Sequence, residues 1–181
     1  MTAVQGEPRP VRRIVTGEDA EGRSLIVSDE LTPNRFMAPY APSYVQVPWA
    51  TGEGAARGDD PAPAGHQFGF HSPKGTILRI VDFPVDTSYN ESQLTEFLDA
   101  NQVRDASNPR HFWFHKTHSL DYAICLEGEI YAMLDEDETL MRAGDVLIQR
   151  ATNHSWSNRS DRPCRMAFIL IALDGEDTSA H

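Results

Sequence analysis

Cysteine is scarce in this sequence, and this absence limits what can hold the protein together. Among its 181 residues there are 2 cysteines, Cys125 and Cys164, and neither belongs to a CxxC pair. Two isolated thiols build neither a disulfide framework nor a zinc knuckle, so we expect both to stay reduced in a cytoplasmic protein.

Positive charge and long apolar runs are lacking as well. The sequence has 16 lysines and arginines and 27 acidic residues, which gives a net charge of −11. Such a surface repels phosphate backbones and anionic lipids, and no basic patch offsets it. The longest apolar run, Met166 to Leu173, is too short to span a bilayer, and residues 1–10 hold no apolar stretch of signal-peptide length. We therefore expect a cytoplasmic protein that binds neither nucleic acid nor membrane.

Several catalytic signatures are also missing. The sequence has no obvious Ser-His-Asp arrangement, no glycine-rich phosphate loop and no internal repeat. What is present is a hydrophobic fraction of 40%, which is typical of a soluble globular protein with a real core.

The pattern along the chain predicts an all-β protein with one short helix. Ser92 to Ala100 places leucines and a phenylalanine at helical spacing after Asn90, a potential N-cap. Thr51 to Gly65 has the composition of a loop, with a lid over a site as the alternative. Short β-forming runs separated by turn residues fill most of the rest and are typical of a sandwich or barrel. Strands are expected at residues 12–16, 24–28, 44–49, 76–83, 111–117, 120–126, 129–134, 139–142, 145–149, 153–157 and 165–172.

We divide the chain into four parts on this basis. Residues 1–10 are polar and expected to be disordered, and residues 11–75 supply strands and a loop that pack on a barrel. The barrel itself spans residues 76–173, and residues 174–181 form a flexible end. Because uncovered sheet edges invite pairing, the strands before residue 51 are expected to extend a sheet edge or to cross to a second subunit, which makes a homodimer the expected assembly.

Two histidines and a carboxylate form the candidate site. Alternate residues of a strand share a face, so His115, Thr117 and Asp121 point the same way, and His154 and Trp156 share a face in a later strand. If the two strands meet inside a barrel, the three ligands His115, Asp121 and His154 converge. Two imidazoles with one carboxylate suit a divalent transition metal and leave open positions, as in non-haem iron sites.

These residues resemble the two motifs of the cupin superfamily. The first motif is matched by His115-Lys-Thr117, then Asp121 and Gly128, and the second by the run from Gly144 through His154 to Asn158. The resemblance covers about Thr76 to Leu173. It implies a double-stranded β-helix, or jelly-roll, barrel that is often dimeric and binds a metal through its motif residues. The runs from Asp121 to Ile130 and from Gly144 to Asn158 look like those of a subgroup of single-domain bacterial and fungal cupins. Some fungal members of this subgroup sit in polyketide gene clusters and are described as oxidoreductases.

The chain also departs from the cupin pattern. Asp121 replaces the usual glutamate and Thr117 the second histidine, so three ligands remain and an empty site is an alternative. His118 would replace Thr117 as a ligand only if a bulge shifted the parity. A further alternative is a helix that aligns His111, His115 and His118, although the aromatic residues between them favour a strand. Four side chains are predicted to line the substrate pocket: Thr117, Cys125, Gln149 and Trp156.

The sequence thus predicts a metal-dependent cupin enzyme acting on a small oxygen-bearing molecule such as a carboxylate, enol or phenol. Iron(II) is the favoured metal, with zinc, manganese and nickel as alternatives. An oxidoreductase or dioxygenase is favoured over a lyase, decarboxylase, isomerase or cyclase, chiefly by family analogy. A barrel that binds a small ligand without turnover is the alternative from a different functional class.

Overall fold

The computed structural model describes residues 9–52, 62–71 and 74–173. The expected disorder of residues 1–8 and 174–181 lies outside the described residues, as does most of the loop predicted between Thr51 and Gly65. Within the described residues, the all-β prediction is confirmed: strands dominate, and one α-helix accompanies them. No helix in this part of the chain is long and apolar enough to cross a membrane.

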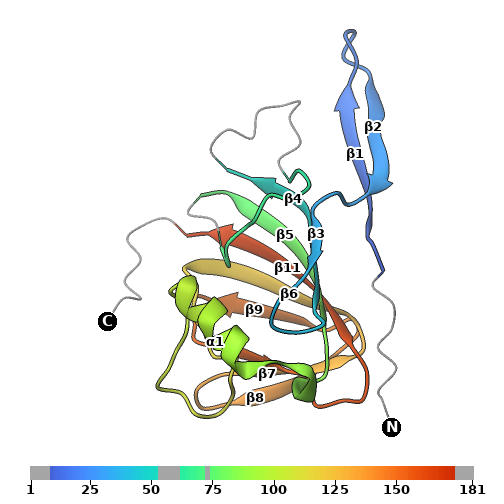
Figure 1. Ribbon diagram of the computed structural model, residues 1–181. Coiled ribbons are helices and arrows are strands. Elements are labelled where there is room, and N and C mark those ends of the chain that lie inside the picture. Colours follow the sequence, from blue (N-terminus) through green and yellow to red (C-terminus); the bar gives the residue numbers. More distant parts are fainter. Residues whose placement is uncertain (1–8, 53–61, 72–73, 174–181) are drawn as a thin grey trace.

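Two antiparallel sheets form the body of the molecule, which is the jelly-roll arrangement expected for a cupin (Figure 1). The six-stranded sheet has, in spatial order, β3 (Arg35–Met37), β4 (Tyr44–Thr51), β5 (Thr76–Phe83), β11 (Cys164–Ala172), β6 (Ser119–Glu127) and β9 (Val146–Arg150). The three-stranded sheet has β10 (Ser155–Ser157), β7 (Glu129–Met133) and β8 (Glu138–Arg142).

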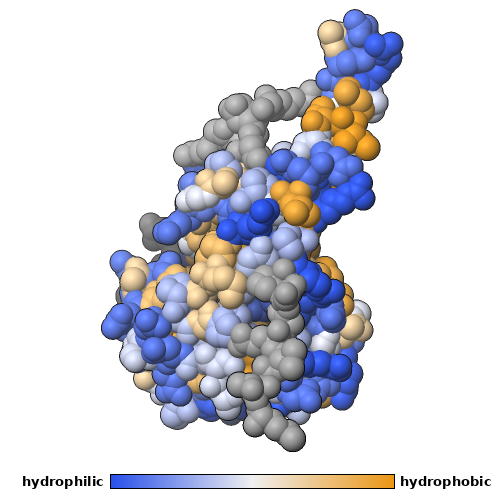
Figure 2. All heavy atoms as spheres, turned by 45° about the vertical axis from the view of Figure 1, so that its right-hand side comes forward, coloured by the Kyte–Doolittle hydropathy of each residue, from blue (hydrophilic) through white to orange (hydrophobic). Residues whose placement is uncertain are grey.

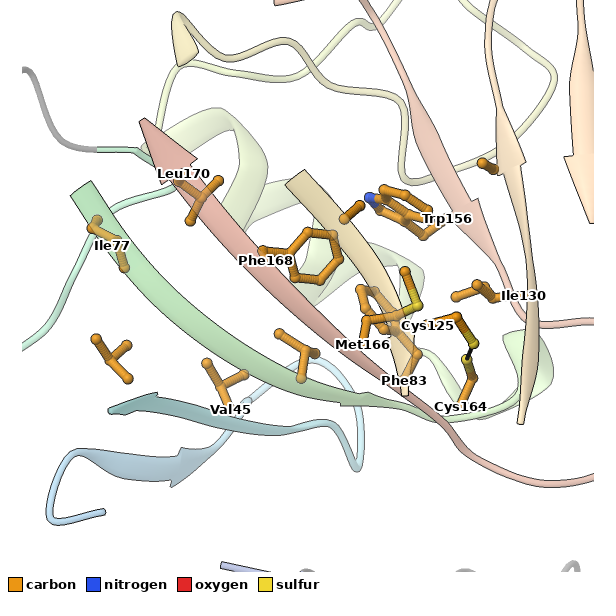
Figure 3. Packing of buried hydrophobic residues seen from close by; sticks show 14 of the residues in the cluster. Val45, Ile77, Phe83, Cys125, Ile130, Trp156, Cys164, Met166, Phe168 and Leu170 are labelled. Carbon is orange, nitrogen blue, oxygen red and sulfur yellow. Dashed lines mark hydrogen bonds between the residues drawn. The ribbon is translucent and has the colours of Figure 1, made fainter. Parts of the chain in front are cut away.

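The hydrophobic core lies between these two sheets. Figure 3 shows Phe168 and Met166 of β11 pointing toward Trp156 and Ile130, which come from the three-stranded sheet. β6 contributes to the same core with a period-2 pattern, because Ala123 and its alternate neighbours are buried while the residues between them are more exposed. The strand parity predicted from the sequence is therefore correct for β6.

The helix α1 (Glu91–Ala100) begins where the sequence predicted. The Asn90 side chain accepts a hydrogen bond from the backbone N–H of Gln93 over 3.2 Å, which satisfies one of the free donors of the first turn. Leu94 and Leu98 are fully buried in a second apolar cluster, together with aromatic residues from the preceding and following segments. A single 3₁₀ turn, η1 (Asp86–Ser88), links β5 to this helix.

The strand predicted at residues 111–117 is wrong, and the alternative helix is wrong as well. Phe112 and Trp113 occupy a turn, and only His115 makes isolated β-bridges. The aromatic residues that suggested a strand pack instead against the α1 cluster, where Trp113 is 5% exposed. Tertiary packing of these rings has overridden the local β preference.

The segment before β1 (Arg12–Glu18) is attached to the six-stranded sheet by Gln46, which is fully buried in β4. Its Oε1 accepts a hydrogen bond from the Val11 N–H over 2.8 Å, and its Nε2 donates to the Arg9 carbonyl over 3.2 Å. Arg165 of β11 also donates to the Arg9 carbonyl. These contacts fix the base of the hairpin that follows, although residues 9 and 10 belong to the segment predicted to be disordered.

The hairpin of β1 (Arg12–Glu18) and β2 (Ser24–Leu31) projects away from the two sheets (Figure 1). Ile14 and Ile26 are 50% and 59% exposed, and Val27 is 56% exposed. Figure 2 shows apolar side chains gathered along this hairpin. An isolated two-stranded ribbon is only marginally stable in water. The exposed apolar side chains of this hairpin therefore indicate that another protein surface covers them.

A second apolar surface lies on the outer face of the six-stranded sheet. There Val146 and Ile148 of β9 are 57% and 51% exposed, and Tyr122 and Leu126 of β6 lie on the neighbouring strand. Because one chain presents two such surfaces, we expect a homodimer in which the hairpin of each subunit covers the β6–β9 face of the other.

The dimer prediction can be tested by light scattering coupled to gel filtration. The wild-type chain should have the mass of a dimer at micromolar concentration. Ile26 and Val27 point to opposite faces of β2, so replacing both by aspartate should give a monomer, because a carboxylate is then buried against apolar surface whichever face is covered. Thr139→Asp adds charge to an exposed position of β8 and should remain dimeric. A wild-type monomer would contradict the prediction.

Candidate active site

A cavity of about 110 Å³ opens between the two sheets and the α1 cluster. Its walls are mostly aromatic and aliphatic side chains, with a small set of polar groups among them. The polar groups come from separate parts of the chain: Tyr40, Ser43, Arg79, His115, Thr117, Asp121 and His154. An apolar cavity with a few converging polar side chains is the usual form of a small-molecule site.

His115 and His154 are brought together by a pair of backbone hydrogen bonds. The N–H of each residue donates to the carbonyl of the other, over 2.9 Å and 3.0 Å. The two imidazole rings then lie side by side with their centroids 4.3 Å apart. This isolated bridge links the segment before β6 to the start of β10, so the convergence predicted from the sequence occurs without a regular strand at His115.

The hydrogen bonds of the two rings determine which nitrogen carries the proton. Nδ1 of His115 lies 2.7 Å from the carbonyl oxygen of Trp113, and Nδ1 of His154 lies 3.0 Å from that of Thr152. A carbonyl only accepts, so both Nδ1 atoms must donate a proton. In a neutral imidazole the lone pair is then on Nε2, and neither Nε2 has a hydrogen-bond partner within the described residues.

Burial keeps both rings neutral. The two residues are 5% exposed, and removal from water lowers the pKa of His154 to about 4. The pKa of His115 is also lowered well below its ordinary value, first by burial and then by the neighbouring His154. Both side chains therefore present an unprotonated Nε2 at neutral pH, which is the form that binds a metal ion.

Asp121 lies on the inner face of β6 and also lines the cavity. It is 3% exposed, and its Oδ1 has no hydrogen-bond partner in the described part of the chain. Burial raises the pKa of this carboxyl to about 6, against the opposing effects of the Ser119 hydroxyl and the Arg79 charge. Thr117, which is also buried, accepts a hydrogen bond from Ser119 at the cavity wall.

The three predicted ligands share the cavity but do not form a closed ligand set. Among residues 9–52, 62–71 and 74–173, no three histidine, cysteine or acidic side chains stand close enough together to hold a metal ion. The paired imidazoles are in place, whereas Asp121 faces the cavity from the neighbouring sheet. His111 lies outside the cavity lining, where its Nδ1 is 2.6 Å from the Ser155 hydroxyl.

Arg79 is a cavity residue that the sequence reasoning missed. It lies on β5 between Ile77 and Val81, and all three share the inner face of this strand. One guanidinium N–H group, on Nη2, donates to the Gly69 carbonyl, and Nε is buried without a partner. The available signal was parity, because a cation alternating with Ile77 and Val81 in an apolar strand must face the core.

Two of the predicted pocket residues require correction. Thr117 and Trp156 line the cavity, whereas Cys125 and Gln149 are not among the described residues that do. Cys125 lies further along β6, where its Sγ is 3.8 Å from the Sγ of Cys164 in the core (Figure 3). Strand parity predicts the correct face for Cys125, but the cavity occupies only one end of that face.

Gln149 supports His154 from behind the site. Its Nε2 donates to the Thr152 carbonyl over 2.7 Å, and this is the same carbonyl that accepts the Nδ1 proton of His154. Asn158, the last residue of the second motif, has a similar structural role. Its amide donates to the carbonyls of Phe83 and Arg162, which holds the end of β10 against the end of β5 and the loop before β11.

Comparison with known proteins agrees with this architecture. Residues 102–171 match the sequence profile of the cupin domain family. This segment includes His115, His154, Asp121 and the strands that place them, so the predicted resemblance to cupins is confirmed.

Several fungal proteins are similar to this chain. A cupin-domain-containing oxidoreductase of Aspergillus ruber, fogC, is 28% identical over 93% of this chain and 75% of its own length. Another, virC of Hypocrea virens, is 26% identical over 92% of this chain and 77% of its own length. A phomopsin biosynthesis cluster protein of Diaporthe leptostromiformis is 35% identical, over 60% of this chain and 49% of its own length.

The protonation of the two histidines is directly measurable. We expect ¹⁵N–¹H correlation spectra of the metal-free protein at pH 7 to show both rings neutral, with the proton on Nδ1. Because the pKa of His154 is lowered to about 4, its ring should remain neutral at pH 5, where an ordinary histidine is largely protonated. Titration of His154 near pH 6.5, or a proton on Nε2, would contradict the assigned geometry.

Proposed function

We propose that this chain is a cupin oxidoreductase that acts on a small oxygen-bearing organic molecule bound in the cavity. We further propose that a divalent transition metal is held by His115 and His154, with Asp121 as the carboxylate ligand. The general class is supported by the cupin domain and by the fungal relatives named as oxidoreductases.

The paired imidazoles are the observation that carries the proposal. Two neutral rings lie side by side, each anchored through Nδ1 to a backbone carbonyl and each with its Nε2 lone pair available. Metal-binding histidines usually donate their other ring proton in this way, because the bond fixes the orientation and the tautomer of the ligand. This donor set fits a divalent transition metal.

Asp121 is the third ligand in this proposal. Its Oδ1 lies at the cavity wall without a partner, and a buried carboxylate oxygen in that condition is costly unless something binds it. A cation there would satisfy this oxygen. Since the three side chains do not form a closed set, the proposal requires Asp121 to turn toward the two rings on binding.

The other cavity residues position the substrate and exclude water. Phe70 packs against the His115 ring with centroids 5.1 Å apart, and Trp156 lies against the His154 ring. The cavity walls are mostly aromatic and aliphatic with a few polar groups among them, so they favour a ligand with an apolar body and an oxygen-bearing group. When bound, the metal would act as a Lewis acid or activate oxygen, with iron(II) favoured for an oxidoreductase.

A metal-free ligand-binding protein is the second candidate. It is favoured by the absence of a three-residue ligand group in the described residues and by the Arg79 guanidinium in the cavity. A fixed cation beside the site lowers the affinity for a metal ion by repulsion. In this alternative the cavity binds its ligand through Arg79 and the two histidines without turnover.

Metal content separates the two candidates. We expect freshly purified protein to hold close to one equivalent of a transition metal by elemental analysis. His154→Ala should lower this content at least tenfold, because it removes one of two neutral nitrogen ligands. His66→Ala, which removes an exposed histidine outside the cavity, should leave the metal content unchanged.

Two outcomes would refute the metal site. One is a wild-type protein that holds no metal and takes up none on incubation with iron(II), zinc, manganese or nickel salts. The other is a His154→Ala variant that retains the wild-type content. Either result would leave the ligand-binding protein as the better description.

A further inference from the structure

The Arg79 guanidinium has no function in the proposed metal site, yet its position among apolar side chains costs free energy. It lies on the inner face of β5 and lines the cavity among apolar residues. Burial lowers its pKa, but an arginine side chain remains charged in proteins. The residue as a whole is partly exposed, but its Nε is buried, and a cation held among apolar side chains is costly unless it is paired with an anion.

No partner of opposite charge neutralises Arg79 within the described residues. Its hydrogen bond goes to the neutral carbonyl of Gly69, and it forms no ion pair. Asp121 and Tyr40 influence it electrostatically without a hydrogen bond. The Nε atom is buried and has no hydrogen-bond partner, so one N–H donor of a cation remains available at the cavity wall.

We propose that Arg79 binds the carboxylate of the substrate, and that the substrate is a small monocarboxylate with an aromatic or branched apolar body. This inference rests on the proposed function only in that both place the substrate in this cavity. It adds the chemical class of the substrate and a specificity-determining residue.

Charge and size both favour a monocarboxylate. One guanidinium matches one negative charge, whereas a phosphate would bring a second charge into apolar walls where the described residues supply no second arginine or lysine. The cavity of about 110 Å³ is of the same order as the dry cavity of roughly 150 Å³ that accepts benzene. A single ring or a branched chain of similar size therefore fits the apolar part.

The aromatic lining places the body of the ligand. Phe70 and Trp113 lie within ring-contact distance of His115, with centroids at 5.1 Å and 5.8 Å. Phe168 is the direct strand neighbour of Arg79 and packs against Trp156. A carboxylate on Arg79 would thus direct the rest of the ligand across these rings toward the two imidazoles.

Benzoate and benzamide form a matched pair of probes, because they share size and shape and differ in charge. Their binding can be followed by the fluorescence of the cavity tryptophans or by calorimetry, with protein as purified and again after dialysis against a chelator. We expect wild-type protein to bind benzoate at least tenfold more tightly than benzamide. Arg79→Gln should weaken benzoate binding by about 10- to 100-fold and leave benzamide binding nearly unchanged, because only the charged contact is lost.

Arg142→Gln is the matched control, since it removes the same charge from an exposed position of β8 outside the cavity lining. It should bind both probes as the wild type does. Arg79→Lys keeps the charge and should recover part of the benzoate affinity. Circular dichroism of each variant establishes that it is folded, and Arg79→Met provides a second uncharged variant if Arg79→Gln does not fold.

Three results would overturn this inference: equal affinity of the wild type for the two probes, no binding of benzoate, or unchanged benzoate affinity in a folded uncharged variant. Failure of the metal site is separable from these. A metal-free protein that still discriminates benzoate through Arg79 refutes the metal proposal and supports the carboxylate site. A metal-loaded protein without this discrimination does the reverse.

Discussion

The site depends on one local interaction, the reciprocal backbone hydrogen bonds between His115 and His154. These two bonds join a turn segment that follows the helix to the start of a short strand, and they bring together residues that are distant in sequence. The side chains then complete the arrangement, because each Nδ1–H is directed to a carbonyl and each Nε2 is left for the cavity. Without this bridge, nothing else in the local backbone would hold the two imidazole rings side by side in the cavity lining.

The surrounding fold supports that bridge from both sides. Behind His154, the Gln149 amide binds the same Thr152 carbonyl as the ring does, so the turn and the imidazole are held together. In front of His115, the aromatic residues packed on α1 fix the turn at Phe112 and Trp113. The site is therefore set at the junction of the core between the sheets and the aromatic cluster around the helix.

Much of the fold could be predicted from the sequence because its strands alternate cleanly. The inner and outer faces of β6 follow period 2, and the helix begins at Asn90 as its side chain dictates. The segment 111–117 could not be assigned correctly, since its aromatic residues are used by a tertiary cluster rather than by a strand. The three-residue strand β3 carries too little local signal to be recognised alone.

The candidate site was predictable in its residue types and less so in its geometry. Parity and motif spacing indicated that His115, Asp121 and His154 face one cavity, and the structure places all three in its lining. Parity could not show how far along β6 the cavity extends, which is why Cys125 was misplaced. Arg79 is not among the predicted site residues, because the run Thr76 to Phe83 by itself indicates only a β-strand and does not show that a cavity lies against one of its faces.

The central claim is that the Nε2 atoms of His115 and His154 bind one divalent metal ion in the cavity. Anomalous diffraction from crystals of metal-loaded protein, recorded on both sides of the metal absorption edge, tests it most directly. The account predicts a single peak within about 2.0–2.3 Å of both Nε2 atoms and of a carboxylate oxygen of Asp121. A fully loaded crystal with no peak in the cavity, or with the metal bound elsewhere on the chain, would contradict it.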